Sequence, residues 1–285
     1  MIERARTFGD TAELACVITE GAPRSAQDDL PAVVMWNAGL LPSVGPYRMY
    51  VDLARRLAES GFTAMRFDLS GIGDSAPDKS AEFSEERAVS EVRQAMDFIE
   101  SSRGVSSFVL VGLCSGAVDS HYVAVEDARV RGAVMLDGYA YRTGGFYLRH
   151  YGSRALRLPT WLRWIGRGAG ALRRDVDGPA DPKLLLDELN YREYPSRERA
   201  EEDVERLVER GARLLYVYSG GAEGHFNNGR QFREMFPRVC QHPGVQVLHL
   251  PDADHLYTVI DDREELIRAI CTWFEAKFGV RRGRK

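Results

Sequence analysis

The chain has 285 residues, a formal net charge of −4, 44% hydrophobic residues and 28% charged residues. This length accommodates one large core plus an insertion, and the composition is typical of a globular protein. No apolar stretch approaches the length of a membrane span, and the charged residues 1–6 precede no apolar run typical of a signal peptide. We therefore expect a cytoplasmic location.

The cysteines are far apart in the sequence and show no C-x-x-C pairing. Neither a zinc site nor a disulfide framework is predicted from this spacing. A reducing compartment would also keep a catalytic thiol free to react. The four positions are Cys16, Cys114, Cys240 and Cys271.

Apolar strand-like stretches alternate with amphipathic helix-like stretches along most of the chain. Apolar strands separated by helices are typical of a parallel sheet that is covered on both faces, so the pattern predicts an α/β fold. We expect an antiparallel pair, 4–8 and 12–19, at one edge of the sheet. The other expected strands are 32–37, 63–68, 108–113, 132–136, 214–218 and 245–250. The expected helices are 47–60, 84–100, 117–128, 229–236 and 264–278.

The segment 141–211 interrupts this alternation, because it contains no convincing strand and is rich in aromatic residues, arginine and helix formers. We interpret it as a helical cap inserted after the sixth strand. The core domain would then consist of residues 1–140 and 212–285. A cap at this point would overhang the C-terminal edge of the sheet and line a substrate pocket.

Residues 109–117 predict a buried strand that turns sharply into a helix, with Cys114 at the apex. Gly112 and Gly116 lie two residues to either side, as a cramped and strained turn requires. This spacing favours Cys114 as a nucleophile. The alternative interpretation is that Cys114 is only a small buried apolar residue.

Ser115 is the rival nucleophile in the same turn. Centring the motif on Ser115 would place Leu113 and Ala117 at the two glycine positions. Because both positions need glycine, we favour Cys114.

The G-x-C-x-G motif resembles the nucleophile elbow of the α/β-hydrolases, with a thiol where most members carry a serine. Together with Asn-Ala-Gly-Leu at 37–40 and Gly-Ile-Gly-Asp-Ser at 71–75, it looks most like a cysteine-bearing branch that includes the exosortase-associated hydrolases. The similarity covers nearly the whole chain outside the cap. It implies an α/β-hydrolase fold with a mostly parallel central sheet, flanking helices and a helical cap.

The resemblance also implies a base and an acid for the nucleophile. His255 lies just past the last expected strand, where the family carries its base; His121 and His225 are the rivals. For the acid that orients the imidazole we favour Glu223, after the strand 214–218, and keep Asp137, after the strand 132–136, as the alternative. Asp252 and Asp254 are expected to be turn residues.

An oxyanion formed in acyl transfer needs two backbone N–H donors. We expect one from Ser115, directly after the nucleophile, and the other from Leu40. Relatives often show His-Gly in the loop that holds Leu40, whereas this chain has Asn37 there. Asp68 and the glycines of residues 71–75 are expected to shape a tight loop rather than to act in chemistry.

These residues predict an acyl hydrolase of esters or thioesters that works through an acyl-cysteine. An acyltransferase is the first alternative, because an acyl-cysteine is itself a thioester and exchanges with a carrier thiol at little cost. A ligand-binding protein that has lost the chemistry is the second. No phosphate-binding loop, metal cluster or nucleotide fingerprint accompanies the motif, so we expect neither a cofactor, a metal nor a nucleic-acid partner.

The first part of the cap is rich in arginine and contains no acidic residue between positions 141 and 174. Interleaved with aromatic residues, these arginines predict a surface for an anionic partner such as coenzyme A or a phosphopantetheine-bearing carrier protein, with a membrane surface as the competitor. Alternatively, they pair with acidic residues of the core or of a second subunit. The sequence does not predict the oligomeric state. The residues expected to bind the partner are Trp161, Arg163, Trp164 and Arg167.

Overall fold

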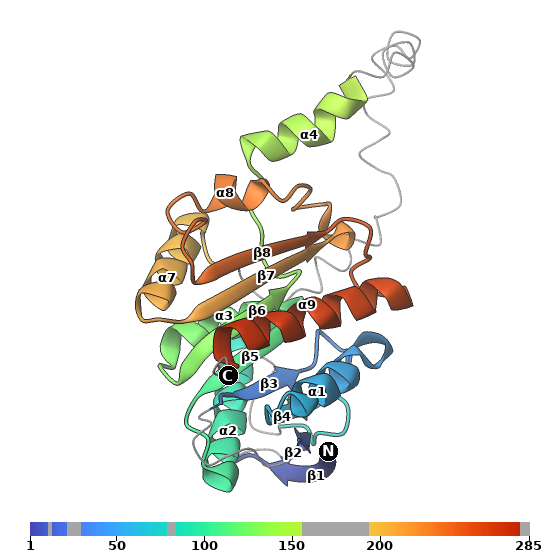
Figure 1. Cartoon of the computed structure of the whole chain (residues 1–285), viewed down its shortest axis with the longest axis vertical. Coiled ribbons are helices and arrows are strands. Elements are labelled where there is room, and N and C mark those ends of the chain that lie inside the picture. Colours follow the sequence, from blue (N-terminus) through green and yellow to red (C-terminus); the bar gives the residue numbers. More distant parts are fainter. Residues whose placement is uncertain (11–12, 22–29, 79–83, 156–193, 280–285) are drawn as a thin grey trace, which may run out of the picture.

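The computed structural model describes residues 1–10, 13–21, 30–78, 84–155 and 194–279. Within them an eight-stranded sheet runs in the order β1-β2-β4-β3-β5-β6-β7-β8 (Figure 1). β2 is antiparallel to both of its neighbours, and all other neighbours are parallel. The strands are β1 (Ile2–Phe8), β2 (Leu14–Glu20), β3 (Ala32–Trp36), β4 (Ala64–Phe67), β5 (Phe108–Leu113), β6 (Val130–Leu136), β7 (Arg213–Ser219) and β8 (Val245–Leu250).

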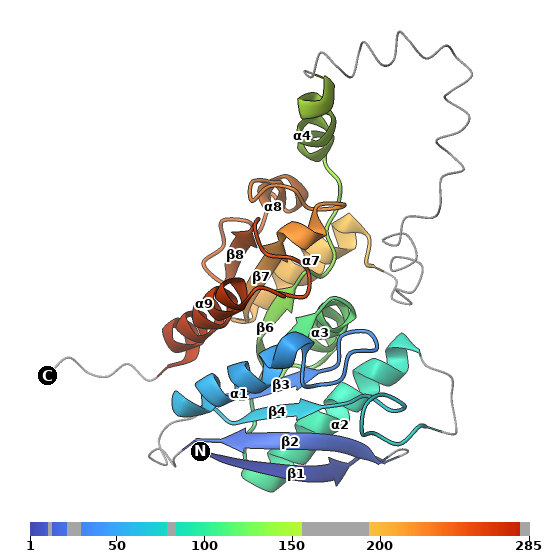
Figure 2. The same ribbon diagram turned by 90° about the vertical axis from the view of Figure 1, so that its right-hand side faces the viewer.

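Two helical layers cover the sheet, as Figures 1 and 2 show. Side chains of β5 alternate between them: Phe108 and Leu110 join the apolar cluster on one side, and Val109 and Val111 the cluster on the other. Because both faces of such a strand are buried, its sequence is a continuous run of apolar residues. The first layer contains α2 (Glu85–Arg103), α3 (Ser115–Glu126), α7 (Arg197–Glu209) and α8 (Gln231–Met235), and the second contains α1 (Met49–Glu59) and α9 (Ile260–Phe278).

The sequence-based α/β-hydrolase fold is confirmed, including the antiparallel pair at the sheet edge. The strands expected at 108–113 and 245–250 match β5 and β8 residue for residue. Helix ends were predicted less well. α2 continues to Arg103, where Gly104 at φ 70° ends it in a left-handed turn.

The segment after β6 contains α4 (Gly144–Ala155), which extends away from the sheet (Figure 2). Residues 156–193 lie outside the described part of the chain. α7, which we expected in the cap, instead buries Ala200, Val204 and Leu207 in the core cluster. The return to the core therefore precedes Arg197 rather than residue 212.

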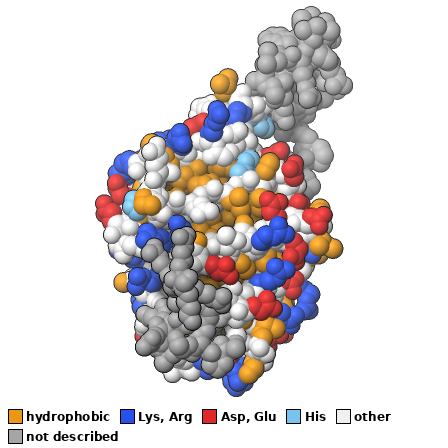
Figure 3. Space-filling model, viewed as in Figure 1, with side chains coloured by type: hydrophobic (Ala, Val, Ile, Leu, Met, Phe, Trp, Pro, Cys, Tyr) orange, Lys and Arg blue, Asp and Glu red, His pale blue; other side chains and the backbone are white. Residues whose placement is uncertain are grey.

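The surface view in Figure 3 shows hydrophobic side chains gathered near the middle of one face, between margins with many charged residues. Among the described residues, no helix is both long and apolar enough to cross a membrane.

Candidate active site

Cys114 is the single residue between the end of β5 and the start of α3, and its backbone conformation is one that L-residues rarely adopt. Its φ is 56° and its ψ is −117°. The turn is held by Cys114 N–H, which donates to the Leu136 carbonyl at 2.9 Å, and by Ala117 N–H, which donates to the Cys114 carbonyl at 3.1 Å. A strained non-glycine residue that its surroundings hold in place is typical of a functional site.

The two glycines of the motif have unequal reasons to be there. A Cβ on Gly112 would lie 2.1 Å from the Gly116 carbonyl oxygen, which no side chain tolerates. A Cβ on Gly116 would lie 3.3 Å from the Asn37 carbonyl oxygen, which is tight but not prohibitive. The close passage of backbone at Gly112 therefore fixes the register of the turn, with Cys114 at its apex.

His255 and Asp137 form a hydrogen-bonded pair, with Nδ1 of His255 2.9 Å from Oδ2 of Asp137. The Asp137 side chain is fully buried, whereas 39% of the His255 side chain is exposed. Ser219 also holds the carboxylate: its N–H donates to Oδ1 at 2.6 Å, and its hydroxyl donates at 2.5 Å to Oδ2, the oxygen that faces His255. The two hydrogen bonds from Ser219 fix the carboxylate, which in turn fixes the imidazole.

Our preference for Glu223 as the acid is not supported by this geometry. Glu223 is exposed, and among the described residues no hydrogen bond or ion pair joins its side chain to His255. The loop after β7 instead packs its backbone against His255, because a Cβ on Gly221 would lie 2.3 Å from the backbone nitrogen of His255. Asp137 comes directly after the neighbouring strand β6, and its φ of 45° belongs to a sharp turn.

The pKa of His255 reflects two opposing influences. Burial lowers it, but the hydrogen bonds and electrostatic attraction of Asp137 and Cys114 outweigh burial and raise the pKa of His255 to about 10. Both neighbours thus stabilise the imidazolium form. The structure brings together three of the side chains that the sequence singled out: a thiol, an imidazole and a carboxylate.

The loop expected to supply an oxyanion donor is tied to the elbow by Ser115. The Gly39 N–H donates to Ser115 Oγ at 2.8 Å. Asn37 donates to the Gly39 carbonyl at 2.7 Å and accepts from the Leu69 N–H at 3.0 Å. Among the described residues, the N–H groups of Leu40 and Ser115 have no hydrogen-bond acceptor, so both remain available.

The loop after β4 has the structural role that its sequence predicted. Asp68 accepts from the N–H of Ser43 at 2.6 Å and from that of Asp74 at 3.2 Å. Gly73, at φ 55°, passes so close to the Asp68 carboxylate that a Cβ would lie 2.3 Å from it. Asp68 therefore shapes the loop, and Asn37 connects this loop to the one that carries Leu40.

Two side chains contribute to the site in ways that sequence reasoning missed. Ser219 orients Asp137, and the hydroxyl of Ser115 holds Gly39, a contact that spans 76 positions. The only local signal for Ser219 is a polar residue that ends an apolar strand. Such a signal becomes meaningful once β6 and β7 are known to be neighbours.

The rival histidine His121 has a structural explanation. It is buried, with Nδ1 3.0 Å from the Tyr139 hydroxyl and Nε2 3.3 Å from a carboxylate oxygen of Asp203. It joins α3 to α7 inside the core.

Two arginines at the start of the cap, Arg142 and Arg149, have partners within the chain. Arg149 pairs with Glu234 of α8 at 2.9 Å and donates to Asn227 at 3.1 Å. Arg142 donates to the Gly224 carbonyl at 2.9 Å. These contacts fasten α4 to the loop after β7 and favour the alternative of pairing within the chain. Trp161, Arg163, Trp164 and Arg167 lie outside the described residues.

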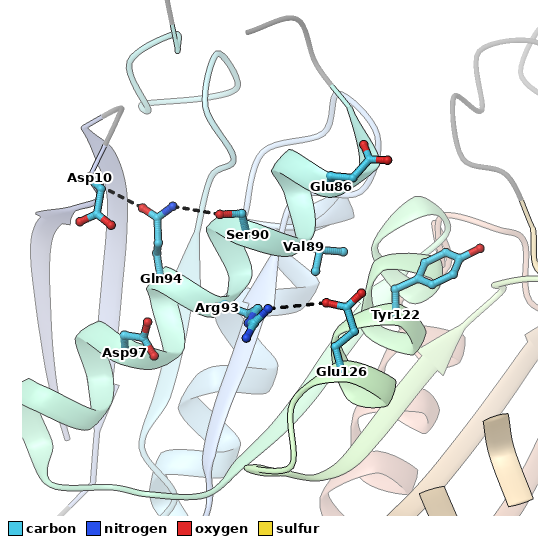
Figure 4. A pocket seen from close by; sticks show the side chains of 9 residues that line it. All are labelled: Asp10, Glu86, Val89, Ser90, Arg93, Gln94, Asp97, Tyr122 and Glu126. Carbon is cyan, nitrogen blue, oxygen red and sulfur yellow. Dashed lines mark hydrogen bonds and ion pairs between the residues drawn. The ribbon is translucent and has the colours of Figure 1, made fainter. Parts of the chain in front are cut away.

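A surface hollow of about 450 Å³ lies between α2 and α3 (Figure 4). Some of its polar groups bind one another: Arg93 pairs with Glu126 at 3.6 Å, and Gln94 accepts from the Asp10 N–H at 3.0 Å. None of the elbow residues lines it. The hollow is a polar groove separate from the site at Cys114.

A mostly parallel sheet that presents a strained turn and a His–carboxylate pair at one edge is the arrangement of the α/β-hydrolases. The family model described as "Alpha/beta hydrolase family" matches residues 33–269, so the chain belongs to this family. No curated protein matches the sequence.

Solved structures share the fold at low sequence identity. A proline iminopeptidase of Mycobacterium smegmatis is 16% identical with a TM-score of 0.59, covering 96% of this chain and 98% of its own. An esterase of Pyrococcus furiosus is 13% identical with a TM-score of 0.61, covering 98% and 91%. The esterase domain of a Rhodothermus marinus protein is 17% identical with a TM-score of 0.58, covering 98% and 100%.

Proposed function

We propose that the protein is an acyl hydrolase of esters or thioesters that works through an acyl-cysteine at Cys114. The observation that carries this proposal is the position of a thiol at the strained apex after β5, where it interacts with His255 of the His255–Asp137 pair. His255 acts as base and acid, and Asp137 orients it and stabilises its cation. Leu40 and Ser115 supply the oxyanion donors through their N–H groups. Under this proposal the chain would belong to the cysteine-bearing branch that its sequence resembles.

The reaction needs no external redox partner. The Cys114 sulfur, having passed its proton to His255, attacks the carbonyl carbon, and the oxygen takes the negative charge. When the intermediate collapses, the bond to the leaving alcohol or thiol breaks and the leaving group takes the proton from His255. Water then attacks the acyl-cysteine while His255 accepts a proton from it. The free acid leaves and the thiol is restored.

Acyl transfer is the second candidate, because the acyl-cysteine is a thioester. Exchange with another thiol is nearly balanced in energy, so an acceptor thiol, alcohol or amine can replace water. The hypothesis of a carrier-bound or coenzyme A-bound acyl donor depends on the residues that the sequence predicts to bind it: Trp161, Arg163, Trp164 and Arg167. Reversal of Arg163 and Arg167 to Glu should raise KM for such a donor, less so at high salt, and leave a small neutral ester unaffected. We place this chemistry in the cytoplasm, because a catalytic thiol must escape oxidation.

The test is intact-mass and peptide mapping of the purified protein after mixing with p-nitrophenyl esters and acyl-thioesters. We expect one acyl group on Cys114 in the wild type and none in Cys114→Ala. Cys240→Ala, which removes another free thiol, is the matched control and should be acylated normally. Product analysis with and without added thiol then separates hydrolysis from transfer. A label on Ser115, or a protein that binds esters without turning them over, contradicts the proposal.

A further inference from the structure

Six large apolar side chains are exposed on two segments, one of which is hydrogen-bonded to the elbow and the other of which follows His255. The first segment is the loop between β3 and α1, and the second is the start of α9. We call these residues the apolar rim: Leu40, Leu41, Val44, Tyr47, Val259 and Ile260. Leu40 is 85% exposed and Ile260 is 66% exposed.

The two segments of the apolar rim lie against each other. The guanidinium carbon of Arg263, in the first turn of α9, lies 5.6 Å from the centre of the Tyr47 ring. The same guanidinium donates to the Tyr257 carbonyl at 2.8 Å. Arg56 of α1 pairs with Glu264 of α9 at 2.7 Å. The apolar rim is therefore one surface rather than two isolated patches.

The apolar rim borders the place where an acyl group would react. Leu40 provides both an exposed apolar side chain and the N–H that we assign to the oxyanion. Val259 follows His255 by four residues, and between them Tyr257 is fully buried at φ 53°. The first part of the apolar rim thus lies at the elbow, to which Gly39 is hydrogen-bonded through Ser115, and the second part contacts the first through Arg263 and Tyr47.

The composition of the two segments indicates the chemistry of the ligand. Residues 38–47 contain no Asp, Glu, Lys or Arg, and neither do residues 255–260. Single exposed apolar side chains are ordinary on a protein surface, but a cluster next to a reactive group marks a binding surface. The exposed side chains of the apolar rim are themselves uncharged, and charged side chains such as Arg263 lie at its edge. Uncharged apolar side chains stabilise a hydrocarbon chain.

We propose that the apolar rim binds the acyl chain of the substrate, so that the enzyme acts on esters or thioesters of aliphatic acids with several carbons in preference to acetyl esters. This inference rests on the proposed acyl-cysteine function. Each methylene that leaves water on the apolar rim favours the longer substrate, and burial of even two methylenes gives roughly a tenfold preference in kcat/KM.

The test compares acetyl, butyryl, octanoyl and lauroyl p-nitrophenyl esters on the wild type and on the double variant Val44→Ser/Val259→Ser. Val259 is the N-cap residue of α9 and makes no capping hydrogen bond, and serine is a preferred N-cap residue, so this change should not harm folding. Ile2→Ser is the matched control, since Ile2 is 52% exposed on β1 at the outer edge of the sheet. Thermal unfolding of all variants checks the fold.

We expect the octanoyl-to-acetyl ratio of kcat/KM to be at least about ten in the wild type and to fall at least about threefold in the double variant. Ile2→Ser should keep the wild-type ratio. Equal rates on all chain lengths, or a ratio that the double variant leaves unchanged, would overturn the inference. A change in oligomeric state or in binding to phospholipid vesicles, with the ratio unchanged, would overturn it in favour of a second copy or a lipid surface.

Binding of free octanoate and free acetate, measured by calorimetry, separates failure of this inference from failure of the proposed function. If no ester acylates Cys114, the proposed function is wrong, whatever octanoate does. If Cys114 is acylated but octanoate binds no better than acetate, the acyl-cysteine function stands and the role of the apolar rim is wrong.

Discussion

Replacement of Ser115 by alanine tests whether the site depends on a side chain next to the nucleophile. Ser115 keeps its N–H in this variant, so one oxyanion donor is unchanged. What disappears is the acceptor for the Gly39 N–H, 2.8 Å away, which ties the Leu40 loop to α3. Ser115 is only 7% exposed, so water cannot freely replace its hydroxyl.

The expected size of the effect follows from two limits. Loss of one neutral hydrogen bond costs about 1 kcal/mol, which corresponds to about a fivefold slower acylation. Complete loss of an oxyanion donor costs about 10²-fold or more. Because Asn37 still holds the Gly39 carbonyl, the loop keeps one anchor. We therefore expect acylation to slow by about 5- to 50-fold, while the final amount of acyl-Cys114 is unchanged.

The assay pairs two reactions of the same thiol. Rapid-mixing kinetics with a p-nitrophenyl ester measure acylation, which uses the oxyanion donors, and alkylation by iodoacetamide does not use them. Ser120→Ala is the matched control, because the Ser120 hydroxyl donates to the Gly116 carbonyl at 2.7 Å within α3 and does not hold the loop. Acylation of Ser115→Ala within twofold of Ser120→Ala would refute the reasoning, as would an equal fall in alkylation.

Three further predictions concern the acid, the base and the elbow. Asp137→Asn should reduce kcat by about 10²-fold or more and Glu223→Gln by less than about twofold, because of these two acids Asp137 is the one that hydrogen-bonds His255. Steady-state kinetics that show the reverse order would return the role of the orienting acid to Glu223. The pKa of His255 is raised from 6.5 to about 10, so the stability that its partners contribute is fully present below pH 6.5 and is lost as the pH rises through about 10. The difference in melting temperature between the wild type and Asp137→Asn should accordingly narrow across that window, and a widening difference would contradict the assignment. Gly112→Ala should lower the free energy of unfolding, measured with denaturant, by about 3 kcal/mol or more, because the added Cβ has no room. Gly144→Ala is the control and should change it by less than about 1 kcal/mol, because nothing lies within 4 Å of the added Cβ. Similar values for the two variants would show that the close passage at Gly112 is not a constraint.

The sequence determined the features that depend on neighbours along the chain. Strand β5 and the turn at Cys114 are encoded in nine consecutive residues, because the apolar run sets a buried strand and the glycine spacing sets the turn. The alternation of strand-like and helix-like stretches likewise predicted a mostly parallel sheet that is covered on both faces. The choice of His255 followed from its place just past the last expected strand, where the family that the sequence resembles carries its base.

Only the tertiary structure decided which acid faces His255 and where the insertion ends. Asp137 and Glu223 both follow parallel strands, so the sequence could not rank them by position. The choice depended on the turn at Asp137, the two hydrogen bonds from Ser219 and the backbone of Gly221 against His255. The contact between Ser115 and Gly39 has the same origin. Each of these contacts joins segments far apart in the chain, and a hydrogen bond depends on distance and direction, which residue order alone does not specify.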